Sequence, residues 1–116
     1  MSRAFDRQAV VACSTLRPPA VGTGGVRGVP VAALSGLRCT PLDPADPGGR
    51  GEAQQRLILE SQGQILETFV RGSVDIRAGD VLAVGARRYA IRAVAQWRWR
   101  HEAYRGLLVE EMGGVE

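Results

Sequence analysis

The strongest constraint on the fold is an alternating pattern between Val81 and Trp99. The apolar run Val81 to Val84 ends at Gly85-Ala86, and two sets of residues alternate after it. A glycine-containing break is typical of a hairpin turn, and a period of two marks a half-buried strand. The odd set is Tyr89, Ile91, Ala93, Ala95, Trp97 and Trp99, and the even set is Ala90, Arg92, Val94, Gln96, Arg98 and Arg100. We predict two antiparallel strands, with Tyr89, Ile91 and Trp97 buried.

Turn-forming residues divide the rest of the chain into further short elements. A first apolar segment ends at Pro18-Pro19, and residues 29–39 form a second one that Gly36 interrupts as a bend or bulge. Residues 104–111 are expected to pair with the strand that carries the tryptophans. Residues 53–70 fit either two short strands or a helical turn followed by a strand. The expected fold class is mainly β: a small β-barrel, SH3-like or similar, with long loops and room for one short helix.

The 116 residues are enough for one domain. We expect a flexible N-terminal arm at residues 1–8, a single barrel domain at 9–111 and a C-terminal tail at 112–116. Three prolines and three glycines fall within residues 41–52. We therefore expect a long exposed loop at 41–54, because such a segment cannot form regular structure and long loops in compact domains are often functional.

The charge is distributed unevenly along the chain. All 15 basic residues are arginine, and the net charge is +3. Six arginines face a single acidic residue between positions 87 and 105. A solvated outer face, a subunit contact and a DNA-facing surface all fit this pattern, since the guanidinium group pairs with carboxylates and phosphates alike.

Several classes of protein do not fit the sequence. Cys13 and Cys39 lack the spacing of zinc ligands, and His101 is the only histidine, so we expect no metal and no cofactor. His101 falls in a predicted turn without an orienting partner, and we expect no enzymatic activity. Residues 22–28 are glycine-rich but lack the ending of a phosphate-binding loop. No apolar stretch is long enough for a membrane helix. The two cysteines are expected to be buried, reduced thiols, with a disulfide left open.

The ordered features of the chain resemble a known family. The pattern consists of a first strand closed by proline, a long Pro/Gly loop, Asp75-Ile76-x-x-Gly79-Asp80-Val81-Leu82, Gly85, Tyr89-x-Ile91-x-x-Val94, Trp97 and a final strand with Leu107-Leu108-Val109. It resembles the head-closure (stopper) proteins of tailed bacteriophages, over residues 9–111. The segment from Asp75 to Val94 is its most specific part.

The resemblance implies a non-enzymatic subunit of the phage neck, a head-tail connector that retains packaged DNA and provides a docking platform for the tail. Its partners would be copies of itself in a ring of twelve or six subunits, the portal or adaptor ring, tail-terminator or tail-tube proteins, and double-stranded DNA in the channel. The protein would be made in the host cytoplasm and reside in the virion, without a membrane partner.

Two groups of residues are the candidate sites. The resemblance implies that the loop faces the channel, through Pro44, Asp46, Gly48, Gly49, Arg50 and Arg56, and residues 22–28 are an alternative loop between subunits. The candidate contacts with other subunits or neck proteins are Arg92, Arg98, Arg100 and His101. Two alternatives remain open: another neck or tail ring component, such as an adaptor or a tail terminator, or a small β-barrel that binds nucleic acid through its arginine face.

Overall fold

A computed structural model describes residues 11–17, 31–48, 50–61, 63–99 and 102–112. Its elements are β1 (Val11–Arg17), β2 (Val31–Cys39), β3 (Asp43–Pro44), α2 (Glu52–Glu60), β4 (Ile65–Arg71), β5 (Val81–Val84), β6 (Arg87–Trp99) and β7 (Glu102–Glu111). The predicted arm at 1–8, the loop at 22–28, the residues Gly49, Arg100 and His101, and the tail beyond Met112 lie outside the described residues.

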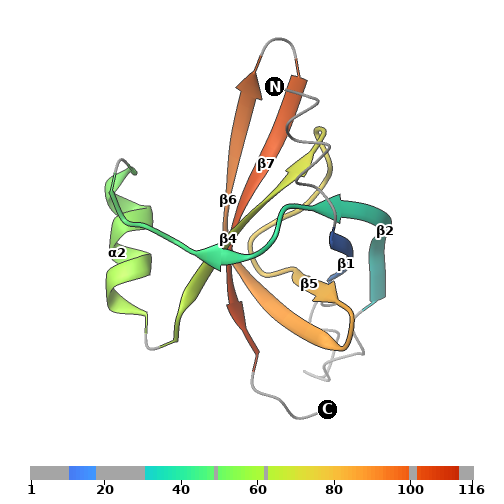
Figure 1. The fold of residues 1–116 in the computed structure, drawn as a ribbon, viewed down its shortest axis with the longest axis horizontal. Helices are drawn as coiled ribbons and strands as arrows, with labels where there is room; N and C mark the ends of the chain where they lie inside the picture. The colour runs from blue at the N-terminus through green and yellow to red at the C-terminus, as the bar shows by residue number, and fades with distance from the viewer. Residues whose placement is uncertain (1–10, 18–30, 49, 62, 100–101, 113–116) are drawn as a thin grey trace, which may run out of the picture.

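The strands form one antiparallel sheet in the order β2-β1-β5-β6-β7-β4-β3. The sheet curls so far that β2 meets β4 again, where Cys39 pairs with Val70. The Thr40 amide extends this contact by donating to the Phe69 carbonyl at 3.1 Å. Figure 1 shows the result, a curled body with α2 on one side and the β6–β7 hairpin projecting beyond it. The prediction of a mainly β fold with one short helix is confirmed for the described residues.

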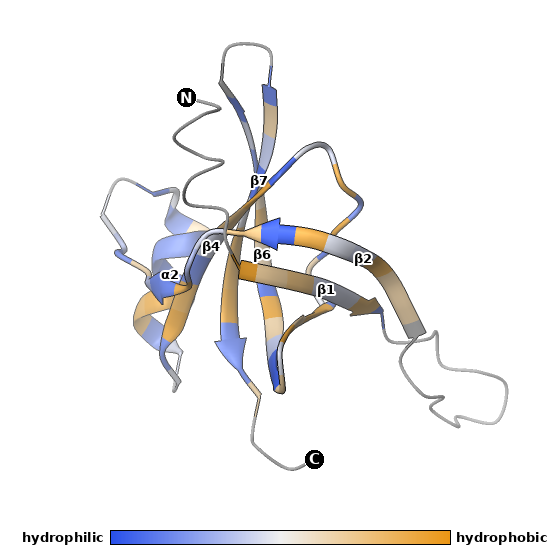
Figure 2. Ribbon diagram, turned by 45° about the vertical axis from the view of Figure 1, so that its right-hand side comes forward, coloured by the Kyte–Doolittle hydropathy of each residue, from blue (hydrophilic) through white to orange (hydrophobic). Residues whose placement is uncertain are grey.

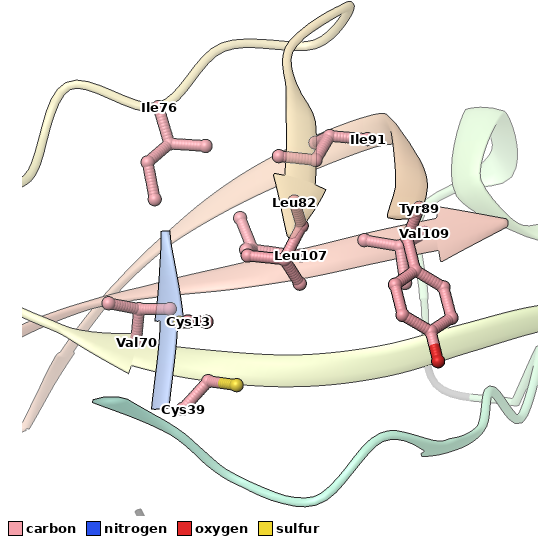
Figure 3. Close-up of a cluster of buried hydrophobic side chains, with 9 residues drawn as sticks. All are labelled: Cys13, Cys39, Val70, Ile76, Leu82, Tyr89, Ile91, Leu107 and Val109. Atoms are coloured by element: carbon pink, nitrogen blue, oxygen red, sulfur yellow. The ribbon is translucent and has the colours of Figure 1, made fainter. Parts of the chain in front are cut away.

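The core lies inside this curl. Nine buried residues from most of the strands meet there, as Figure 3 shows: Cys13, Cys39, Val70, Ile76, Leu82, Tyr89, Ile91, Leu107 and Val109. Both cysteines are buried and free, as expected of reduced thiols. No helix among the described residues has the length and apolar character needed to cross a membrane.

The bend predicted in the second strand is present. Gly36 has a φ of +71°, a value that glycine adopts without strain. The register between β1 and β2 shifts at this point, because Cys13 pairs with Leu37 whereas Thr15 pairs with Leu34. The extra residue on β2 bends the strand around the core.

A second irregularity, in β6, overturns one prediction. Ile91 pairs with Val109, but the next pair is Ala93 with Leu108, so Arg92 is an extra residue in the strand. Such a bulge moves all the following side chains to the opposite face. Tyr89 and Ile91 are buried as predicted, whereas Trp97 is 55% exposed. The prediction that Trp97 belongs to the core with them is wrong, because the period of two does not continue through the bulge.

The segment expected to be one long loop is more ordered than predicted. Pro44 pairs with Leu66 in a two-residue strand, and the Ala45 amide donates to the Ile65 carbonyl at 2.9 Å. The helix already begins at Glu52. Among the described residues, the irregular part is therefore 45–48 and 50–51 rather than the whole of 41–54. For residues 53–70, the alternative of two short strands is wrong, and the structure has a nine-residue helix followed by β4.

Two buried threonines differ in their hydrogen bonding. The hydroxyl of Thr68 donates to the Thr40 carbonyl at 2.6 Å and lies 3.2 Å from the Thr40 hydroxyl. The hydroxyl of Thr15 is buried without a partner among the described residues. A buried hydroxyl without a hydrogen bond costs stability, whereas a bonded one contributes to it.

These two sites predict opposite responses to the same substitution. Thr15→Val replaces an unbonded hydroxyl with a methyl group, and we expect a free energy of unfolding that is unchanged or higher by about 1 kcal/mol. Thr68→Val removes the hydrogen bond to the buried Thr40 carbonyl and should lower it by about 1 to 3 kcal/mol. Urea unfolding of both variants measures the difference. Equal destabilisation by the two changes would contradict the assignment.

Candidate functional site

The segment at the centre of the family resemblance is built around a buried carboxylate. Asp80 is 3% exposed, and its two oxygens each accept a bond of 3.1 Å from Arg17, at Nε and Nη2. One of these oxygens also accepts the Arg77 amide at 3.0 Å, which closes the turn before β5. A bidentate guanidinium and a backbone donor together satisfy the buried charge.

The other residues of the segment follow from this turn. Gly79 has a φ of +99°, and its amide donates to the Ile91 carbonyl at 2.8 Å. The Ile76 side chain is 5% exposed and packs in the core. Asp75 is exposed, and Arg77, followed by Arg17, holds the pKa of its carboxyl below the ordinary value. The contacts of the two aspartates therefore give both a structural role at this turn.

Sequence reasoning missed the partner of this segment. Arg17 lies 63 positions away from Asp80, at the end of β1. No spacing rule indicates a contact of that range. The available signal is the position of Arg17 just before Pro18-Pro19, where the strand must end.

Removal of the buried carboxylate should destabilise the fold strongly. We expect Asp80→Ala to lower the free energy of unfolding by about 3 kcal/mol, because it leaves Arg17 without its main partner and opens the turn. Asp75→Ala, the matched control, removes an exposed carboxylate from the same arginine and should cost much less, because solvent screens an exposed ion pair. Thermal unfolding of both variants checks the contrast, and equal effects would contradict it.

The candidate channel-facing residues lie in and beside the 45–51 segment. Pro44 is part of β3, the Asp46 carboxylate accepts the Gly48 amide at 2.9 Å, and Gly49 lies outside the described residues. Arg50 is fastened to β4 by an ion pair of 2.6 Å with Glu67, and its side chain is only 13% exposed. Arg56 is exposed on α2 and pairs with acidic residues one turn away on either side.

All three nitrogens of the Arg50 guanidinium group donate hydrogen bonds. In addition to the bond to Glu67, Nε donates to the Asp46 carbonyl and Nη1 to the Gln54 side chain at 3.3 Å. The Arg50 carbonyl accepts the Gln55 side-chain amide at 2.8 Å. Arg50 therefore joins the irregular segment to the sheet and to the first turn of α2. Whether these residues face a channel stays a prediction.

The candidate contact residues lie on the projecting hairpin. Arg92, the bulge residue, forms an ion pair with Glu110. Arg98 is exposed. Gln96, two residues before it in β6, pairs with Arg105 of β7, so Arg98 and Arg105 lie on the same face of the hairpin. Neither arginine has an ion pair with another described residue. Arg100 and His101 lie outside the described residues, and Figure 2 shows hydrophilic residues near the tip.

The opposite face of this hairpin carries aromatic rings. Trp97 pairs directly with Tyr104, and Phe69 pairs with Gly106 on the neighbouring strand. A Cβ atom on Gly106 would lie 2.8 Å from the Trp97 Nε1 and 3.1 Å from the Phe69 Cε1. Both rings therefore occupy the space that a side chain at 106 would fill. We call the surface formed by Trp97 and Phe69 over Gly106 the aromatic shelf.

An open pocket adjoins the aromatic shelf. Its volume is about 390 Å³, and its lining is Thr40, Pro41, Asp43, Glu67 and Phe69. Phe69 belongs to both the pocket and the shelf, so the two form one continuous surface. The shelf was missed by sequence reasoning because Trp97 was assigned to the core. Among the described residues, no group of three or more potential metal ligands is present.

The bulge predicts that Trp97 contributes little to folding. We expect Trp97→Ala to lower the free energy of unfolding by about 1 kcal/mol, since the ring is half-exposed and packs on one side only. Ile91→Ala, on the core side of the bulge, should cost about 2 to 5 kcal/mol. Chemical denaturation distinguishes the two, and a large loss for Trp97→Ala would place that ring in the core after all.

Comparisons with known proteins show a remote likeness. No family model matches the chain, and no curated protein sequence is significantly similar to it. Among solved structures, the chain is similar to the phage-like element PBSX protein xkdH from Bacillus subtilis, with a TM-score of 0.41 and 13% sequence identity. The match covers 85% of this chain and 92% of the other. A likeness of this degree carries no argument about function.

Proposed function

We propose that the chain is a structural protein of a tailed-phage virion, a ring-forming head-closure or head-tail connector subunit of the neck. The observation that carries the proposal is the sequence pattern from Asp75 to Val94, which resembles that of head-closure proteins. This pattern corresponds to one structural unit, in which Arg17 and Asp80 join β1 to the β5–β6 hairpin. The partners we propose are a portal or adaptor ring on one side and tail proteins on the other.

The shape of the molecule supports a role in assembly. The β6–β7 hairpin extends past the end of β4, which pairs with β7 only as far as Tyr104, so residues 98–99 and 102–103 lie beyond it (Figure 1). The hairpin carries the exposed Arg98 and the half-buried Arg105 on one face and the aromatic shelf on the other. Arginine and tryptophan are the residues most enriched at energetically important interface positions.

For the candidate loop, the contacts favour repulsion of DNA over binding of DNA. Arg50 and Arg56 already bind carboxylates of the same chain, whereas Asp43 and Asp46 are exposed. A loop of this composition repels DNA phosphates rather than gripping them. We therefore propose that residues 41–54, where Asp43, Asp46 and Glu52 outnumber Arg50, act in the neck by bulk and by negative charge, with Arg50 holding the segment in place.

The decisive experiment is to locate the chain in particles of the phage that carries its gene. We expect electron cryomicroscopy of purified virions to show the chain as a ring between the portal complex and the tail. Particles that lack the protein should package DNA and then lose it or fail to join tails, and the purified protein should restore them. Full infectivity without the protein, or density for it outside the neck, would refute the proposal.

A second candidate is a barrel that binds nucleic acid. It is favoured by one observation, that Arg98 and Arg105 share a hairpin face without ion pairs to other described residues. Binding of duplex DNA by the isolated protein that weakens steeply with salt, and is lost in Arg98→Gln, would favour this candidate. The neck proposal expects only weak binding by the isolated protein.

A further inference from the structure

The aromatic shelf is a surface that the fold itself does not require. Trp97 is 55% exposed, and its indole N–H has no hydrogen-bond partner among the described residues. The absence of a side chain at Gly106 nevertheless seats the ring against the backbone beside Phe69. A large aromatic ring that is both exposed and held in place is typical of an interaction site, because little side-chain freedom is lost when a partner covers it.

The chemistry around the shelf selects a cationic partner. Asp43 lines the adjoining pocket, is exposed, and has no ion pair with another described residue. The Glu67 carboxylate lies in the same pocket, although Arg50 already binds it. A planar guanidinium group fits such a surface, since it stacks on aromatic faces while donating to carboxylates.

The chain itself carries a matching surface. The turn between β5 and β6, at Gly85 and Ala86, is followed by Arg87 and Arg88, the first residues of β6, which are exposed and have no ion pair with another described residue. Gly85 holds this turn in a left-handed conformation with a φ of +60°. Figure 1 shows the turn at the end of β6 that lies far from the β6–β7 connection, across the view from α2.

We propose that the aromatic shelf of one copy binds the β5–β6 turn of a second copy, with the guanidinium group of Arg87 or Arg88, which point to opposite faces of β6, stacking on Trp97 and Phe69 and facing Asp43. Because the two surfaces are different and lie near opposite ends of β6, the contact is head-to-tail, and repetition of it generates a ring or a filament. The inference deepens the proposed function by naming the contact between ring subunits, and it rests on that proposal only for the closure of the ring.

The first test measures self-association of the purified chain by sedimentation equilibrium, and by the concentration dependence of the Trp97 indole N–H resonance. We expect Trp97→Ala to weaken association by about tenfold or more. Gly106→Ala should also weaken it, because the added methyl group displaces the ring without removing it. Leu59→Ala is the matched control, since Leu59 is 70% exposed on α2 and lies outside both surfaces.

The turn is tested by charge reversal. The double variant Arg87→Glu/Arg88→Glu should weaken association as strongly as the shelf variants, and the single changes Arg87→Glu and Arg88→Glu show which arginine carries the contact. Arg38→Glu is the control, because Arg38 is another exposed arginine without an ion pair to a described residue. Circular dichroism and thermal unfolding of each variant establish that the fold is retained. A variant that does not fold is replaced by Arg87→Gln, Arg88→Gln or Trp97→Leu.

Mixing the variants distinguishes a head-to-tail contact from a symmetric one. Trp97→Ala retains an intact turn, and the double arginine variant retains an intact shelf, so an equimolar mixture should form pairs that neither variant forms alone. Such pairs should not grow into longer assemblies, because the free shelf of each pair carries the Trp97 substitution and its free turn carries the two arginine substitutions. A symmetric contact through the shelf alone would give no recovery on mixing.

The inference is overturned if the wild-type chain shows no concentration dependence by either measurement, if the shelf and turn variants associate like the controls, or if mixing gives no pairs. These outcomes are independent of where the chain resides. Association through these surfaces in a protein absent from the neck would refute the proposed function alone. A neck ring that assembles normally from the variants would refute this contact alone.

Discussion

The ion pair between Arg17 and Asp80 is the constraint on which the rest of the fold depends. It lies where β1 ends and β5 begins, and these two strands share only three residue pairs, from Ser14–Ala83 to Leu16–Val81. Without the ion pair, this short ladder would be the only link between the β1–β2 hairpin and the main part of the sheet at that edge. Asp80 also accepts the Arg77 amide, which closes the turn that leads into β5. The buried Asp80 carboxylate therefore meets Arg17 only when β1 and β5 pair in the correct register.

The bulge at Arg92 resolves a conflict that a strand of 13 residues would otherwise face. The first part of β6 has to form the wall of the core, and the last part projects beyond it. If the alternation continued unchanged, Trp97 would point to the core side, where no core remains to cover it. The extra residue reverses the faces, so that the aromatic ring rests on Gly106 and the basic residues lie on the other side. One inserted residue therefore separates the folding surface of β6 from its exposed surface.

Local patterns in the sequence predicted the local elements well. Gly85 and the alternation around Tyr89 and Ile91 predicted the hairpin, and Gly36 predicted the bend in β2, because these features act over a few residues. The sequence could not predict what depends on distant partners. The bulge at Arg92 leaves no mark in composition, and the fastening of Arg50 to Glu67 depends on the path of β4. The candidate surface was missed for the same reason, since it is assembled from β4, β6 and β7 only after folding.

The two halves of the proposed subunit contact lie near opposite ends of the same strand. The arginines of the turn are the first residues of β6, and Trp97 is close to its last. An extended strand rises by ~3.3 Å per residue, so about ten residues separate the two surfaces by ~30 Å. A head-to-tail assembly through them would place β6 across each subunit from one contact to the next. The backbone hydrogen bonds of β6 to β5 and β7 would then hold the two contacts at a fixed separation. A fixed separation is what a closed ring requires, because a flexible connection between the two contacts would allow many curvatures instead of one.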